Sequence, residues 1–136
     1  MACIFCKISK KKAKAYIVYE NKDTIVFLDK GSATKGHALI VPKRHYRDIY
    51  DISQNTLKEL IVTSKKIAIL YKKKLGVGAI DIAHASGKGS GQSVFHFHLH
   101  LIPRYKGDGI NEQSWWASNY ETKYKFDEVL KQIKSK

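Results

Sequence analysis

The chain places three histidines at every second position of one short segment, His96-Phe97-His98-Leu99-His100-Leu101-Ile102. In an extended strand, successive side chains point to opposite faces, so the three imidazoles share one face at a spacing of roughly 6.6–6.8 Å. Phe97, Leu99 and Leu101 then face the other way, into a core. Half of the six histidines of the chain lie in this row. Packing does not require imidazoles at that density, so we expect a chemical site built on a rigid strand.

The size and composition indicate one globular domain. The chain has 136 residues, of which 43% are hydrophobic, and this is ordinary for a soluble protein with a sizeable core. No apolar run approaches the ~20 residues of a membrane span. The segment 1–7 lacks the order of a secretory signal, because its lysine follows the apolar residues. We therefore expect a cytoplasmic protein with no membrane partner.

The net charge of +13 comes almost entirely from lysine. Only Arg44, Arg47 and Arg104 among the 25 basic residues are arginine. Lysine is a hydrated point charge that attracts phosphates, whereas arginine supplies bidentate readout. The composition is thus weak evidence for sequence-specific nucleic-acid recognition, and we interpret most lysines as a solvated face.

Periodicity predicts strands before and after one long helix. Strands are expected at residues 16–20, 24–29, 37–41 and 79–83, with Pro42 ending the third. Apolar residues at helical spacing predict a helix between an N-cap at Ser53 and a stop at Gly76. Residues 3–8 are expected to form a short helix or a turn. This order favours an α+β domain with a mostly antiparallel sheet.

The C-terminal part is expected to belong to the same domain. We predict a catalytic domain over residues 1–105 and a tail over 106–136. The spacing of Phe126, Val129, Leu130 and Ile133 predicts a terminal amphipathic helix in that tail. The pair Trp115-Trp116 could anchor the core, contact a second copy or cover the site, and we favour packing.

The histidine row admits three interpretations: a metal site, a nucleophile with its positioning neighbours, or buried hydrogen-bonded imidazoles. The last suits a lone histidine better than three in alternation. A glycine-rich segment, Ser86-Gly87-Lys88-Gly89-Ser90-Gly91, lies directly before the row. Glycines allow backbone amides to approach a phosphate, and Gln92 and Ser93 add side-chain donors. The segment alone could be a flexible turn, but beside the imidazoles it suggests a phosphate held next to a nucleophile.

The sequence resembles the histidine triad family. The resemblance lies in residues 91–104, Gly91-Gln92-Ser93-Val94-Phe95-His96-Phe97-His98-Leu99-His100-Leu101-Ile102-Pro103-Arg104, and in segments 3–8, 27–29 and 35–45. It spans roughly residues 3–105, and the triad together with Lys35-Gly36-His37-Ala38-Leu39-Ile40-Val41-Pro42-Lys43-Arg44-His45 is highly specific. It implies nucleotide hydrolases and transferases that cleave at an α-phosphate, usually homodimers that join their sheets.

The resemblance also implies a role for each matching residue. His98 would be the nucleophile and form a nucleotidyl-imidazole intermediate, so the chemistry needs no metal. The other expected catalytic residues are His100, His37 and Ser93. Gly91, Gln92 and Ser93 would contact the phosphate or the leaving group, and Asp29 the ribose hydroxyls. The expected base pocket is walled by Ile4, Phe5, Ile8 and Phe27, which could equally be plain core.

The implied substrates are adenosine phosphoramidates or dinucleoside polyphosphates. Two alternatives stay open: a nucleotide-binding regulatory module without turnover, and an enzyme that removes adenylate from nucleic-acid ends. The chain departs from the family pattern at Ala85, where many members have asparagine, and at Lys30-Gly31-Ser32, which replaces an apolar residue and a proline. These changes affect substrate preference. His84 lies beside Ala85 but out of register, so it receives no role.

A second site is suggested by Cys3-x-x-Cys6, which has the spacing of half a zinc site. The motif alone could also be redox-active or merely buried, although no strand can precede it as in thioredoxin. Some triad relatives, including galactose-1-phosphate uridylyltransferases, pair such cysteines with two histidines. The matching residues are His45 and His96. A closed Cys₂His₂ site would hold structural Zn²⁺ and leave His98 and His100 for phosphate chemistry.

Overall fold

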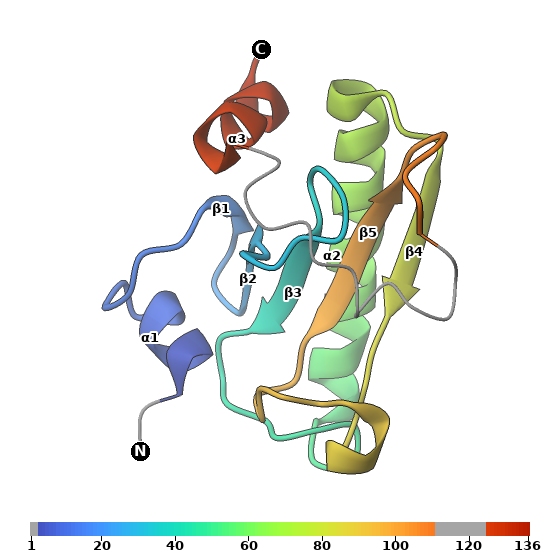
Figure 1. Cartoon of the computed structure of the whole chain (residues 1–136). Helices are drawn as coiled ribbons and strands as arrows, with labels where there is room; N and C mark the ends of the chain where they lie inside the picture. The colour runs from blue at the N-terminus through green and yellow to red at the C-terminus, as the bar shows by residue number, and fades with distance from the viewer. Residues whose placement is uncertain (1–2, 111–124) are drawn as a thin grey trace.

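The computed structural model describes residues 3–110 and 125–136. Its centre is a five-stranded antiparallel sheet with the order β1-β2-β3-β5-β4 (Figure 1). The strands are β1 (Ile17–Glu20), β2 (Thr24–Leu28), β3 (Ala38–Pro42), β4 (Ala79–Ala83) and β5 (Leu99–Arg104). The predicted α+β class and mostly antiparallel sheet are confirmed.

Three helices and one short 3-10 turn accompany the sheet. They are α1 (Ile4–Ser9), α2 (Gln54–Leu75), η1 (Lys88–Ser90) and α3 (Phe126–Lys134). The long helix has the predicted ends. The Ser53 hydroxyl accepts a hydrogen bond from the Thr56 N–H at 3.1 Å, and Gly76 closes the helix in the left-handed conformation.

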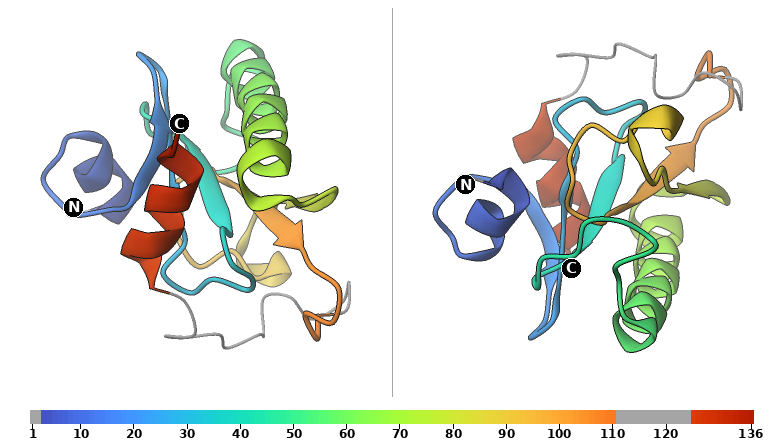
Figure 2. Two further views of the ribbon diagram at one scale, coloured as in Figure 1. Left: turned by 90° about the horizontal axis from the view of Figure 1, so that it is seen from above. Right: turned by 90° about the horizontal axis from the view of Figure 1, so that it is seen from below.

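The sheet separates two cores. Its residues Val26, Ile40 and Leu101 pack with α2 and α3 on one face. Alternate residues, among them Phe27 and Leu39, pack with α1 on the other face. Figure 2 shows α1 and α2 on opposite sides of the sheet. The two-residue period of the strands thus divides the molecule into a thick helical layer and a thinner layer under α1.

The histidine segment differs from its prediction in one respect. The strand begins only at Leu99, so His96 and His98 precede it. Pairing with β3 ends at Ile40↔Leu99, because the next residues of β3 lead to Pro42, which has no N–H to donate. The alternation itself holds: Phe97, Leu99 and Leu101 belong to the helical core, whereas His98 packs against Phe5 of the opposite layer.

Smaller differences concern strand ends and edges. His37 and Asp29 were expected inside strands, but each lies one residue outside. Both strands stop where these side chains turn to other partners. Ile82, on the edge strand β4, is 45% exposed. The predicted C-terminal helix is confirmed as α3, which packs against α2 and β1. Trp115 and Trp116 lie outside the described residues.

Within the described ranges, no helix is long and apolar enough to cross a membrane.

Candidate functional site

A cavity of about 480 Å³ opens between α1, the end of β2 and the segment that precedes β5. Every residue expected to bind or cleave a nucleotide lines it: Ile4, Phe5, Ile8, Phe27, Asp29, His37, Gly91, Gln92, Ser93, His98 and His100. These residues come from five separate parts of the chain. Ala85, Lys30 and Gly31 line the same cavity, so both departures from the family pattern face it.

The apolar wall of the cavity is also part of the core. Phe5, Ile8 and Phe27 are nearly fully buried and belong to the layer under α1. The rings of Phe5 and Phe27 meet edge to face at 5.4 Å, and Phe5 meets the His98 ring in the same way at 5.2 Å. The two interpretations of these side chains therefore coincide, because the surface that completes the core also floors the cavity beside His98.

The ring of His98 is oriented by the backbone. Its Nδ1–H donates to the carbonyl oxygen of His96 at 2.7 Å, which leaves a lone pair on Nε2. The side chain is 8% exposed, and this burial lowers the pKa of His98. A neutral imidazole with a free Nε2 is the form that attacks phosphorus.

His37 and His100 form a relay of fixed direction. The Ala33 N–H donates to Nδ1 of His37 at 2.9 Å, so His37 carries its proton on Nε2. That Nε2 lies 3.0 Å from Nδ1 of His100 and donates to it, which leaves the proton of His100 on Nε2. Burial lowers the pKa of each of these imidazoles to about 3. The relay is therefore neutral, and His100 offers an N–H donor.

Asp29 adds a carboxylate to the relay. One oxygen, Oδ2, lies 3.5 Å from Nε2 of His37, and the other accepts from the Gly31 N–H at 2.9 Å. Asp29, His37 and His100 together resemble a metal-binding group by distance. The Ala33 bond disfavours a metal here. A metal on Nε2 of His37 would place the ring proton on Nδ1, against the Ala33 N–H.

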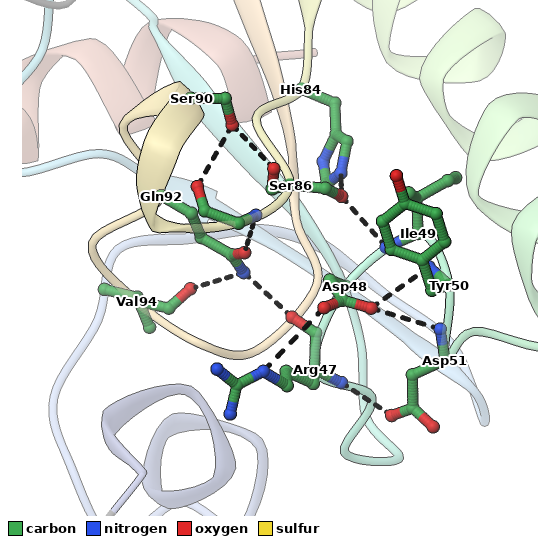
Figure 3. A network of polar contacts seen from close by, with 11 residues as sticks. Arg47, Asp48, Ile49, Tyr50, Asp51, His84, Ser86, Ser90, Gln92 and Val94 are labelled. Carbon is green, nitrogen blue, oxygen red and sulfur yellow. Dashed lines mark hydrogen bonds and ion pairs between the residues drawn. The ribbon is translucent and has the colours of Figure 1, made fainter.

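The glycine-rich segment is held closed by Gln92. Its amide nitrogen donates to the carbonyl oxygens of Arg47 and Val94, and its Oε1 accepts from the Gly87 N–H at 2.7 Å (Figure 3). Gln92 was expected to contact the phosphate or the leaving group. Its amide is instead engaged with backbone groups, so it positions the loop. The exposed Ser93, at the cavity wall, keeps its expected role as a prediction.

A second cluster joins Cys3, Cys6, His45 and His96. Their candidate ligand atoms are separated by 3.1 Å between the two Nδ1 atoms and by 3.3–3.6 Å between sulfur and Nδ1. Zn–S bonds of ~2.3 Å and Zn–N bonds of ~2.0–2.1 Å give tetrahedral edges of about 3.3–3.8 Å. The Nε2–H of His96 donates to the Pro42 carbonyl at 2.7 Å, which turns Nδ1 toward the cysteines. The residues therefore fit Zn²⁺.

The site includes residues that sequence reasoning missed. His84, which received no role, donates from Nδ1 to the carbonyl oxygen of His98 at 2.9 Å. The Ala33 amide and the Arg47 carbonyl are backbone groups, and no sequence pattern identifies them. The single available signal for His84 was a histidine at the end of a predicted strand and next to the glycine-rich loop. All six histidines of the chain thus lie in these two connected sites.

Comparison with known proteins agrees with this geometry. The model of the HIT domain matches residues 10–107. The chain belongs to the histidine triad family. An uncharacterised HIT-like protein of Methanocaldococcus jannaschii is 40% identical over 97% of this triad protein and 98% of its own length. Among solved structures, a zinc-bound histidine triad family protein from Mycobacterium smegmatis has a TM-score of 0.86 and 30% identity, covering 98% of this chain and 91% of its own.

A HIT family hydrolase from Legionella pneumophila has a TM-score of 0.69 and 31% identity, covering 76% of this triad protein and 94% of its own chain. The similarity to a zinc-bound member and to a hydrolase agrees, at a coarse level, with both sites described above.

Proposed function

We propose that this protein cleaves nucleotides at the α-phosphate through a nucleotidyl intermediate on His98. The observation that carries the proposal is the free Nε2 of a neutral, oriented imidazole at the wall of a nucleotide-sized cavity. The triad pattern and a hydrolase among its structural relatives support it. The substrates are adenosine phosphoramidates or dinucleoside polyphosphates.

The reaction has two displacements. Nε2 of His98 attacks phosphorus, the N–P bond forms, and the bond from phosphorus to the leaving nitrogen or oxygen breaks. Water then attacks phosphorus, the N–P bond breaks, and the nucleoside monophosphate leaves. The Nε2–H of His100 and the glycine-rich loop would stabilise the charge on the phosphoryl oxygens, and Ser93 would contact the leaving group. Dividing one difficult step into two lowers each barrier.

The decisive experiment compares His98→Asn with His98→Ala and the wild-type protein. An asparagine side chain can still donate to the His96 carbonyl, but it has no nucleophile at the Nε2 position. We expect both variants to bind AMP and to lose turnover of an AMP amidate by at least about a thousandfold. Mass spectrometry of wild-type protein quenched at alkaline pH should show one nucleotidyl group on the peptide that contains His98. Wild-type rates in either variant would contradict the proposal. Tight binding of AMP without any turnover would favour a regulatory module.

We also propose that the protein is a homodimer that joins sheets along β4, which is an edge of the sheet order. Large apolar side chains are exposed beside that edge and on α2: Ile82, Ile61, Val62 and Ile69, at 45–62%. A soluble surface rarely keeps such a group without a partner. Ultracentrifugation should give twice the chain mass, and Ile82→Lys should shift it toward the monomer.

The structural Zn²⁺ belongs to the proposal too, held by the Cys3, Cys6, His45 and His96 cluster with no open position. It would fix α1 to the sheet and take no part in the displacement. The high lysine content leaves nucleic-acid ends as a less favoured substrate. Turnover of such a substrate would fall steeply with salt, because phosphate contacts release counterions.

A further inference from the structure

The backbone of the proposed nucleophile lies just beyond the hydrogen-bonded sheet. Pairing of β4 with β5 ends at Ala83↔His100, and pairing of β3 with β5 ends at Leu99. The peptide of His98 therefore lacks ladder partners on both sides. A catalytic ring attached to an unpaired backbone segment needs another source of rigidity, because productive geometry tolerates errors of well under 1 Å.

The side chain of His84 occupies the position where the ladder stops. His84 directly follows the last residue of β4, and its Nδ1–H donates to the carbonyl oxygen of His98 at 2.9 Å. Its ring is stacked on the ring of Phe97, with centroids 4.2 Å apart and planes inclined by 26°. One imidazole thus supplies the hydrogen bond that a continued β4 strand would have supplied from its backbone.

The other edge of the His84 ring is also engaged. Its Nε2 accepts from the Ser86 hydroxyl, and the Ser86 Oγ accepts from the Ile49 N–H at 2.9 Å. The Ser86 carbonyl in turn accepts from the Ser90 hydroxyl at 2.7 Å (Figure 3). These bonds are consistent with a single tautomer of His84, with the proton on Nδ1. The ring therefore connects the nucleophile segment to the glycine-rich loop.

The remaining bonds around His98 show what this connection holds. The Phe97 N–H donates to the Tyr46 carbonyl at 2.6 Å, and the His98 ring itself donates to the His96 carbonyl. The carbonyl of His98 has His84 as its side-chain donor. Releasing that carbonyl would let the peptide between His98 and β5 rotate, and with it the direction of the nucleophilic nitrogen.

We infer that His84 is a positioning residue, whose imidazole holds the His98 backbone in register with the phosphate-binding loop. This inference rests on the function proposed above. His84 touches neither the phosphorus nor the nucleotide. It would set how often Nε2 of His98 points at phosphorus, and so it would act on the rate of nucleotidyl transfer and not on nucleotide affinity.

The test uses His84→Asn and His84→Ala in the full chain. The amide nitrogen of asparagine can replace the Nδ1–H donor, whereas alanine cannot. We expect His84→Ala to slow single-turnover formation of the His98 adduct about 10- to 100-fold, with the Kd of AMP changed less than threefold. His84→Asn should recover most of that rate. Ser86→Ala, which frees only the far edge of the ring, should slow the reaction less than His84→Ala.

A spectroscopic measurement makes the inference independent of turnover. Long-range ¹⁵N–¹H correlation spectra of the unmodified protein at neutral pH should show His84 protonated on Nδ1. An Nε2–H tautomer would overturn the inference, whatever the enzyme does. So would an His84→Asn variant as slow as His84→Ala, or a loss confined to AMP affinity. By contrast, absence of any adduct in the wild-type protein would count against the proposed function.

Discussion

Each imidazole of the site has one ring nitrogen engaged by a backbone group, and this leaves the other nitrogen for chemistry. The His96 carbonyl fixes His98, the Ala33 amide fixes His37, and the Pro42 carbonyl fixes His96. Identical side chains thereby become a nucleophile, a donor relay and a metal ligand. The difference lies in whether the backbone partner donates or accepts, since this sets the tautomer.

The carboxylate of Asp29 gives a prediction at this scale. If it accepts hydrogen bonds from ribose hydroxyls, Asp29→Asn should weaken selectively the binding of ribonucleotides. We expect AMP to lose about 10-fold in affinity, because a hydrogen bond to a charged group contributes ~1.5–3 kcal/mol. The control ligand is the 2′,3′-dideoxynucleotide, measured by calorimetry with both proteins. The assignment fails if Asp29→Asn weakens both ligands equally.

The chemistry of this fold lies one residue beyond the ends of its strands. Asp29 follows β2, His37 precedes β3, His84 follows β4 and His98 precedes β5. At these positions the backbone leaves the ladder while the neighbouring strand still holds it firmly. The side chains can therefore turn toward loops and cavities without losing a rigid support.

Two glycines test how tightly such ends are built. Gly36 has φ +88°, and a Cβ there would lie 2.8 Å from a methyl carbon of Leu75. Gly76 has φ +69° with open space around it. Gly76→Ala should cost ~1–2 kcal/mol for the left-handed backbone alone. Gly36→Ala should cost more, since it adds a clash between the turn before β3 and the end of α2.

Urea denaturation of the two variants gives the comparison. Equal losses of unfolding free energy would mean that Leu75 moves aside freely and that the turn is not packed against the helix.

For the molecule as a whole, the Cys₂His₂ cluster connects three distant segments. It joins the start of α1, the loop after β3 and the segment before β5. One of its ligands, His96, is two residues from the proposed nucleophile, and α1 carries the apolar wall of the cavity. The metal cluster and the cavity are therefore mechanically one unit, although only one of them performs chemistry.

Zinc removal should accordingly affect stability first. The purified protein should contain near-stoichiometric zinc, and a strong chelator should lower the Tm by roughly 10 °C or more. Calorimetry with and without chelator measures this. Cys3→Ser/Cys6→Ser protein is the control, because its Tm should not respond to the chelator. An unresponsive wild-type protein without bound metal would contradict the assignment.

The buried relay makes the whole fold sensitive to acid. His37 and His100 stay neutral when folded, with pKa values of about 3, but they titrate near 6.5 when unfolded. Between these values the unfolded state binds more protons. The stabilisation is therefore complete above pH 6.5 and is lost as pH falls, by ~1.4 kcal/mol per pH unit for each imidazole.

Urea denaturation of zinc-free protein at pH 7, 6 and 5 should show this loss. In that form His96, whose pKa burial lowers to about 4, contributes in the same direction. Asp108, held below its usual pKa by Arg104, titrates under this range and does not interfere. A flat profile between pH 7 and 5 would show that the imidazoles are hydrated or already charged.

The sequence predicted the elements well because their signals are local. The period of two in the strands, the Ser53 cap and the Gly76 stop each involve residues a few positions apart. The histidine strand began later than expected because its end depends on Pro42 of another strand. Gln92 and His84 were misjudged or missed for the same reason, since their partners are backbone groups of distant loops.

By itself, the sequence determined the class of the fold, the residues that line the cavity and the residues that gather around zinc. Those follow from side-chain type and spacing, which a chain carries before it folds. Only the tertiary structure decided the tautomer of each imidazole and the support of the nucleophile by His84. These depend on which carbonyl or amide lies about 3 Å away, and that distance exists only once separate segments have packed together.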